Sequence, residues 1–200
     1  MKYLIAILII SSSVKSFAQE IEVKNLKKHV YFLADDKMKG RGTGSEENLK
    51  AAKYIAKEFK KYKLQPLGED GFFQGFEAKV KKVKVVDSIR SAKNVIAFLD
   101  NKAEKTIVIG AHYDHLGEGK QGSSLAKDSY GMIHNGADDN ASGVAGLLEL
   151  ARFYSKNKMT EPVNFLFIAF GAEELGLVGS RYFVKHPTYD LSKVHWMLNM

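Results

Sequence analysis

The sequence predicts an α/β fold: a doubly wound, mostly parallel central sheet with helices on both faces. Two observations lead to this prediction. Short apolar runs bounded by polar or glycine residues recur along the chain, and segments with helical spacing of apolar or small residues alternate with them. Continuous apolar runs are typical of strands that are buried on both faces of a parallel sheet. The order strand, helix, strand, helix, strand therefore predicts a doubly wound sheet.

The first well-defined helix is expected from about Glu46 to Lys63, because apolar residues recur there at spacings of three and four. Ser45 alone, or Thr43 together with Glu46, can cap it. The preceding segment 40–44 reads Gly-Arg-Gly-Thr-Gly and resembles a phosphate-binding loop. However, no apolar strand precedes it, and its glycine spacing fits neither nucleotide fingerprint. We interpret it as a tight turn that feeds the helix.

The later elements follow from the same patterns. The loop from Gly119 to Gly136 has no clear period, and a loop of this length usually carries function or lines a site. The last apolar segment stops in mid-run, so we expect an N-terminal piece of a longer protein. The predicted strands are 94–99, 106–110, 163–170 and 194–200, and the predicted helices are 142–154 and 175–185.

The composition limits the classes of protein to which this chain can belong. Two hundred residues, 45% hydrophobic and 26% charged, are ordinary for one globular domain. The net charge of +7 comes mostly from lysines, such as Lys50, Lys79, Lys81, Lys82 and Lys84, and arginines are few. A nucleic-acid surface would favour clustered arginines with interleaved aromatic residues, so we expect no nucleic-acid partner. The absence of cysteine excludes disulfides.

Residues 1–18 differ from the rest of the chain. Lys2 is followed by an apolar run from Tyr3 to Ile10, a serine-rich stretch and the small residues of Ser16-Phe17-Ala18. This pattern is typical of a signal peptide cleaved before Gln19. Eight apolar residues are too few to span a bilayer, so we expect export to the periplasm or the medium without stable membrane insertion. The domain prediction is a signal peptide, 1–18, and an incomplete catalytic domain, 19–200.

Acidic and imidazole side chains follow three of the predicted elements. His112 and Asp114 come at the end of one strand, and Glu173 and Glu174 follow another. Asp138 and Asp139 lie in a glycine-bounded turn before a helix. Because ligands bind at the carboxyl ends of the strands in open α/β sheets, we expect these groups to share one site.

The residue types at this site indicate metal-assisted hydrolysis. Zinc binds imidazole nitrogen and carboxylate oxygen, and His112 is the natural imidazole ligand. Asp114 is placed to orient it from the outer shell. Two aspartates exceed what a helix cap needs, so metal binding explains the pair at 138 and 139. Of the adjacent Glu173 and Glu174, one can bind metal while the other faces the attacking water.

These motifs resemble one family, the secreted zinc aminopeptidases of the bacterial leucyl aminopeptidase type, whose relatives include glutamate carboxypeptidase and glutaminyl cyclase. The resemblance implies a phosphorylase/hydrolase-like zinc peptidase fold with two zinc ions. It implies that His112 binds the first zinc, Asp138 bridges both, Glu174 binds the second, Glu173 is the general base, and Asp114 orients His112. It also implies a cis peptide between Asp138 and Asp139. The family resemblance rests on the motifs at residues 33–36, 40–44, 110–115, 136–143 and 170–179.

The family pattern also expects an aspartate ligand just after Met200 and a later histidine ligand. With two protein ligands for each zinc, the 200-residue piece is expected to bind metal poorly and to hydrolyse little. The other histidines are not expected to replace the missing ligands. His115 can line the cleft, and His134 can contact substrate. Packing or surface roles are expected for the remainder, His29, His186 and His195.

The predicted function is that of an exported metallo-aminopeptidase that hydrolyses the N-terminal bond of a peptide. Three alternatives remain open. The first is a carboxypeptidase or dipeptidase of the same fold, and the second is a glutaminyl cyclase. The third is a non-catalytic binding module built on a peptidase scaffold.

Overall fold

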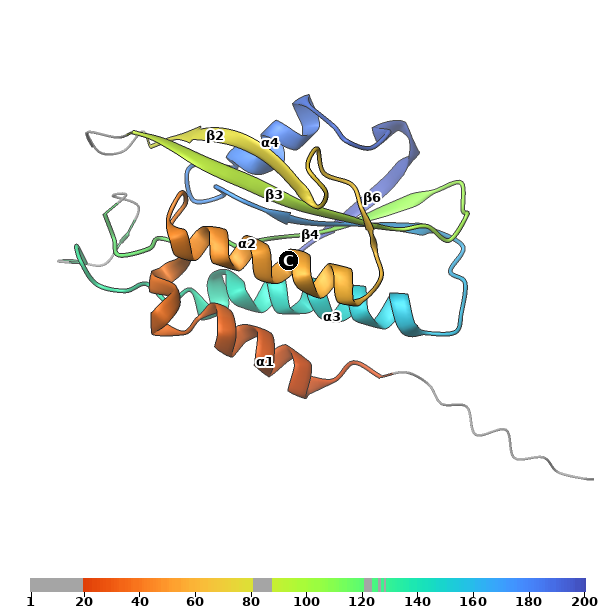
Figure 1. Ribbon diagram of the computed structural model, residues 1–200, viewed down its shortest axis with the longest axis horizontal. Coiled ribbons are helices and arrows are strands. Elements are labelled where there is room, and N and C mark those ends of the chain that lie inside the picture. Colours follow the sequence, from red (N-terminus) through yellow and green to blue (C-terminus); the bar gives the residue numbers. More distant parts are fainter. Residues whose placement is uncertain (1–19, 81–87, 121–123, 126, 128) are drawn as a thin grey trace, which may run out of the picture.

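The chain folds into a sheet with helices on both faces, as the computed structural model shows (Figure 1). The structure describes residues 20–80, 88–120, 124–125, 127 and 129–200. The expected signal peptide lies outside these residues, as do Lys81, Lys82 and Lys84. Within the described ranges, no helix is long and apolar enough to cross a membrane.

The helices and strands follow the predicted order. The main helices are α1 (Val23–Leu33), α2 (Glu46–Lys61), α3 (Gly143–Lys156) and α4 (Val178–Lys185). Short helical turns are η1 (Asp36–Arg41), η2 (Ala137–Ser142) and η3 (Leu191–Lys193). The strands are β1 (Gln65–Pro66), β2 (Phe73–Lys79), β3 (Ile89–Leu99), β4 (Thr106–His112), β5 (Asn164–Phe170) and β6 (Val194–Asn199).

The sheet is mixed. Its order is β1-β3-β5-β4-β6, with β2 on β3. β4 is parallel to both β5 and β6, as expected, whereas β3 is antiparallel to β5, β1 and β2. The turn 100–105 between β3 and β4 explains the difference. A parallel crossover needs a dozen or more residues, so this short connection reverses the chain direction.

Helices cover the two faces of the sheet unequally. On one face, α2 and α3 pack against the sheet, and α1 lies outside them (Figure 1). On the other face, α4 covers a smaller apolar cluster that includes Ile96, Leu166 and Phe183. Every residue of β5 is buried, as its continuous apolar run predicts. The predicted α/β class with helices on both faces is therefore confirmed.

Element boundaries differ from the predictions in three places. β2 was not predicted, and β3 begins at Ile89 rather than Asn94 because its first residues pair with β2. α4 begins at Val178, after a turn in which the main-chain oxygen of Glu173 accepts from the amides of Gly176 and Leu177. α2 agrees closely with its prediction. Ser45 alone caps it, accepting from the amide of Asn48.

Candidate metal centre

His112 is the last residue of β4, and its imidazole is held by its own strand end. Nδ1 donates to the main-chain oxygen of Asp114 at 3.1 Å. This bond leaves Nε2 unprotonated in the neutral imidazole, and Nε2 lies 3.0 Å from Oδ1 of Asp139. A nitrogen lone pair and a carboxylate oxygen at that distance repel unless a proton or a metal cation lies between them. Imidazole nitrogen and carboxylate oxygen are atoms that bind zinc, so this pair can supply two ligands to one cation.

The carboxylate of Asp114 joins the ends of β4 and β5. It is fully buried. Oδ1 accepts from the amide of Glu173 at 3.0 Å, and Oδ2 accepts from the amide of Glu174 at 3.3 Å. The hydroxyl of Thr43 also donates to Oδ2, at 2.9 Å. Oδ1 lies 3.9 Å from Nδ1 of His112. Asp114 therefore holds His112 chiefly through its main chain, while its carboxylate positions the two glutamates.

Asp139 reaches the site from the turn before α3. Gly136 begins this turn with φ of +57°, and a Cβ there would lie 2.5 Å from the main-chain oxygen of Asp139 and 2.6 Å from the ring of His115. Only glycine fits so close an approach. Behind the turn, the buried side chain of Asn140 accepts from the amide of Gly143 at 3.0 Å.

The expectation that Asp138 occupies the central position is corrected by this turn. Neighbouring side chains diverge, so only one aspartate can face the imidazoles, and the close contacts with His112 and His115 are made by Asp139. Asp138 lines the same cavity and accepts from the hydroxyl of Ser142 through its main-chain oxygen. The cis peptide also lies one residue later than expected, between Asp139 and Asn140.

Glu174 and His115 complete the cluster. Nδ1 of His115 lies 2.6 Å from Oε1 of Glu174 and 3.9 Å from Oδ2 of Asp139. The ligand atoms of these three residues all lie within 4.8 Å of one another, which is close enough to hold one metal ion. The sequence analysis expected His115 only to line the cleft. Its direct contact with Glu174 arises because the stretch after β4 pairs with Gly42 through a β-bridge.

Glu173 faces the same cavity as His112 and Asp139. Oε2 of Glu173 lies 4.0 Å from Nε2 of His112. Burial raises the pKa of Glu173; His112 lowers it, and the negative charges of Asp114, Glu174 and Asp139 raise it further. Burial also raises the pKa of Asp114. A carboxylate with a raised pKa accepts a proton from water more readily, as general-base chemistry requires.

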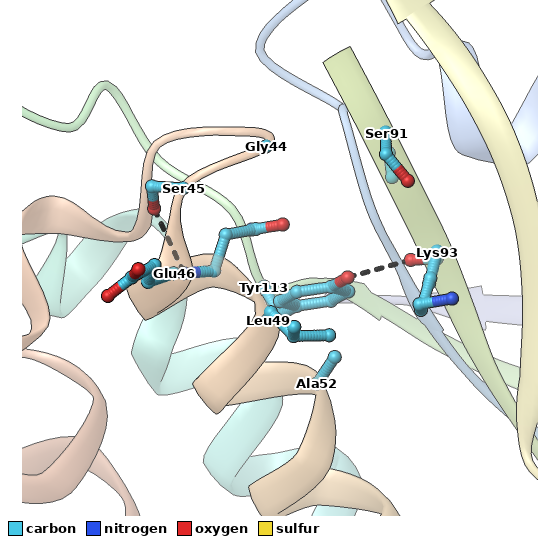
Figure 2. Close-up of a pocket in the computed structure, with 10 residues that line it drawn as sticks. Gly44, Ser45, Glu46, Leu49, Ala52, Ser91, Lys93 and Tyr113 are labelled. Atoms are coloured by element: carbon cyan, nitrogen blue, oxygen red, sulfur yellow. Dashed lines mark hydrogen bonds between the residues drawn. The ribbon is translucent and has the colours of Figure 1, made fainter.

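Two pockets lie near these residues, and one contains the candidate site. The site cavity has a volume of about 530 Å³. A smaller pocket, of about 190 Å³, lies between the start of α2 and β3, where the hydroxyl of Tyr113 donates to the main-chain oxygen of Lys93 (Figure 2). That pocket is mainly apolar. The residues that line the site cavity are His112, Asp138, Asp139, Asn140, Phe170, Glu173, Leu177, Ser180, Met197, Asn199 and Met200.

Three other histidines occupy the elements expected for them. His29 is buried in α1, His186 follows α4, and His195 lies in β6. Nε2 of His134 lies 2.9 Å from the hydroxyl of Ser124. The structure thus brings His112, Asp114, Glu173 and Glu174 together with Asp139 and His115, and Asp138 lines the same cavity.

Solved structures share this fold. A Zn-dependent exopeptidase from Parabacteroides distasonis superposes with a TM-score of 0.69 at 19% identity, and the match covers 91% of this chain and 62% of that one. A glutaminyl cyclase from Bacteroides thetaiotaomicron gives a TM-score of 0.71 at 18% identity, with the same coverage of both chains. The chain therefore has the α/β fold that is common to this exopeptidase and this cyclase.

Sequence comparison identifies the family, which similarity of fold does not. Residues 94–200, more than half of the chain, match peptidase family M28, and the chain belongs to this family. A probable leucine aminopeptidase from Trichophyton verrucosum is 27% identical over 193 residues, covering 94% of this chain and 47% of that protein. The chain thus spans about half the length of this curated relative. The predicted resemblance to zinc aminopeptidases is confirmed at the level of the family.

Proposed function

We propose that the protein containing this chain is an exported, two-zinc aminopeptidase that removes the N-terminal residue of peptides. Membership of family M28 and the similarity to a probable leucine aminopeptidase support hydrolysis of peptides. The single observation that carries the proposal is the convergence of His112, Asp139, Glu173 and Glu174 at the carboxyl ends of β4 and β5.

The ligand atoms fit zinc. In our proposal His112 and Asp139 hold one ion, and Asp139 and Glu174 hold the other. The two oxygens of Asp139 face different imidazoles, with Oδ1 toward His112 and Oδ2 toward His115, which suits a carboxylate shared between two ions. Nitrogen and oxygen ligands of this kind are those that catalytic zinc uses.

Bound zinc supplies Lewis acidity: it polarises the scissile carbonyl and lowers the pKa of a water molecule. The chain's own contribution is proton transfer and positioning. Glu173 accepts a proton from the attacking water as the new C–O bond forms. It then returns that proton to the amine as the C–N bond breaks. Asp114 holds the amides of Glu173 and Glu174, so the base and the ligand keep their relative positions.

The substitution Glu173→Gln tests this assignment, because it removes the base with little change of shape. In the protein of full encoded length, we expect kcat on aminoacyl-nitroanilides to fall by about 10²-fold or more. Zinc content, measured by mass spectrometry, is expected to remain at two ions per chain. Glu69→Gln, at an exposed glutamate, is the matched control. Wild-type turnover in the Glu173 variant would exclude Glu173 as the base.

The products distinguish peptidase from cyclase. With a peptide that begins with glutamine, an aminopeptidase releases free glutamine. A glutaminyl cyclase instead releases ammonia and leaves a pyroglutamyl peptide. Ammonia as the only small product would contradict the proposal and support the second candidate, whose fold this chain shares.

A further inference from the structure

The glycine-rich segment (residues 40–44) contains a buried cation that the proposed chemistry does not use. The side chain of Arg41 is fully buried, and its guanidinium donates to four main-chain oxygens. Nε donates to Tyr113 at 2.9 Å, and Nη2 donates to Gly136 at 2.9 Å. Nη1 donates to Asn135 at 2.7 Å and also to Leu33.

Three of these acceptors belong to the two segments that carry the candidate ligands, and the fourth, Leu33, ends α1. Tyr113 lies between His112 and Asp114, and Asn135 and Gly136 lead directly into the turn of Asp139. One guanidinium therefore joins a strand end to a helix start that are more than twenty residues apart in sequence. The ring of Tyr113 is itself anchored to β3 through its hydroxyl (Figure 2).

The main chain of the segment is bent to make these contacts. Lys39, Gly40 and Arg41 are left-handed, with φ of 41°, 66° and 49°. This conformation is unfavourable for a residue other than glycine. A Cβ on Gly40 would lie 2.3 Å from the main-chain oxygen of His134, so the segment is pressed against the loop before Asp139. Such unfavourable backbone persists where the surroundings enforce it, commonly at functional sites.

The charge of Arg41 complements the site. Burial lowers its pKa to about 10, and the negative charges of Asp114 and Asp139 raise it. The guanidinium of Arg41 therefore places a positive charge beside carboxylates that repel one another in the absence of metal. Thr43, two residues later in the same segment, donates to the buried carboxylate of Asp114. The segment thus contacts both the charge and the backbone of the candidate centre.

We propose that Arg41 is a positioning residue, which holds the turn of Asp139 and the segment 112–114 in a ligand-ready arrangement before metal binds. This inference rests on the proposed zinc site. Four carbonyl acceptors around one planar group need the fork of donors that arginine provides and lysine does not. The contribution of Arg41 is therefore to metal affinity and to the geometry of the bound metal.

The experiment compares Arg41→Lys and Arg41→Ala with Arg152→Lys and Arg152→Ala in the protein of full encoded length. Arg152 is a matched control, because it is also buried but pairs with Glu149 within α3. Three quantities are measured: zinc affinity by competition with a chromophoric chelator, the visible absorption spectrum of the cobalt-substituted protein, and the free energy of unfolding in excess chelator.

We expect both Arg41 variants to bind zinc at least about tenfold more weakly and to show an altered cobalt spectrum, as is usual when support of a ligand is lost. The Arg152 variants are expected to lose stability while retaining wild-type zinc affinity and spectrum. A merely structural role for Arg41 would produce the Arg152 pattern.

Two results would overturn the inference alone. One is wild-type zinc affinity in the folded Arg41 variants. The other is that both Arg41 variants stay unfolded even in saturating zinc, which would make the role structural. Failure of the wild-type protein to bind zinc would instead overturn the proposed function, together with everything that rests on it.

Discussion

At the scale of single residues, the sequence does not determine which of the adjacent Asp138 and Asp139 faces the imidazoles. Both are aspartates in one glycine-bounded turn, and the sequence provides no reason to prefer either from spacing alone. The left-handed start of the turn at Gly136 decides the matter, because it directs the carboxylate of Asp139 to His112. The contact of His115 with Glu174 was not predicted for a similar reason. The segment that holds His115 is fixed by a β-bridge to Gly42, which is distant in the sequence.

This difference predicts unequal effects of two isosteric substitutions. Asp139→Asn removes a negatively charged oxygen from the candidate ligand set, so zinc affinity is expected to fall by at least about tenfold, with a parallel loss of turnover. Asp138→Asn is the matched control and should have a much smaller effect. Chelator competition and nitroanilide hydrolysis measure the two quantities. A larger loss in the Asp138 variant would restore the original assignment of the central position to Asp138.

At the scale of elements, α1 is held to the rest of the molecule partly by a buried imidazole. His29 is 1% exposed, and its Nδ1 lies 2.7 Å from the hydroxyl of Tyr54 in α2. Burial lowers the pKa of His29 from 6.5 to about 4. The sequence predicted a packing or surface role for this residue, and the structure shows it buried against Tyr54.

The lowered pKa predicts a pH dependence of stability. Between about pH 6.5 and pH 4 the unfolded chain binds a proton at His29 that the folded chain does not, so stability falls as the pH falls through this window. The loss attributable to His29 is on the order of 3 kcal/mol by pH 4. Urea unfolding of the wild type and of His29→Gln across this window measures it. Equal pH dependence in the two proteins would contradict the prediction.

At the same scale, helix and strand positions were predictable where the pattern of apolar residues is clear. The three-and-four spacing of α2 and the apolar run of β5 locate these elements to within two residues. β2 was missed because only its alternate residues are buried, so it lacks a continuous apolar run. The direction of β3 depends on the length of the turn 100–105, which composition does not show.

At the scale of the whole molecule, the chain combines a family M28 fold with an N-terminal segment typical of export. The absence of cysteine from the sequence means that its folding needs no disulfide formation.

The proposed export predicts where the mature chain begins. We expect signal peptidase to cleave before Gln19, so that the protein recovered from the periplasm or the medium begins at that residue. N-terminal sequencing and intact-mass measurement of the fractionated protein test it. Deletion of residues 2–18 should retain the protein in the cytoplasm. A protein that still begins at Met1 in the exported fraction would be inconsistent with a cleaved signal.

The sequence by itself determined the fold class, the peptidase family and the grouping of His112, Asp114, Glu173 and Glu174 at one candidate site, because these depend on local periodicity and on motifs that occur at strand ends. The tertiary structure alone decided which aspartate faces the imidazoles and which polar groups stand behind them. The side chains of Asp139, His115 and Arg41 contact segments that are distant from them in the chain. Such contacts depend on turn geometry and on the packing of one segment against another, which residue spacing does not encode.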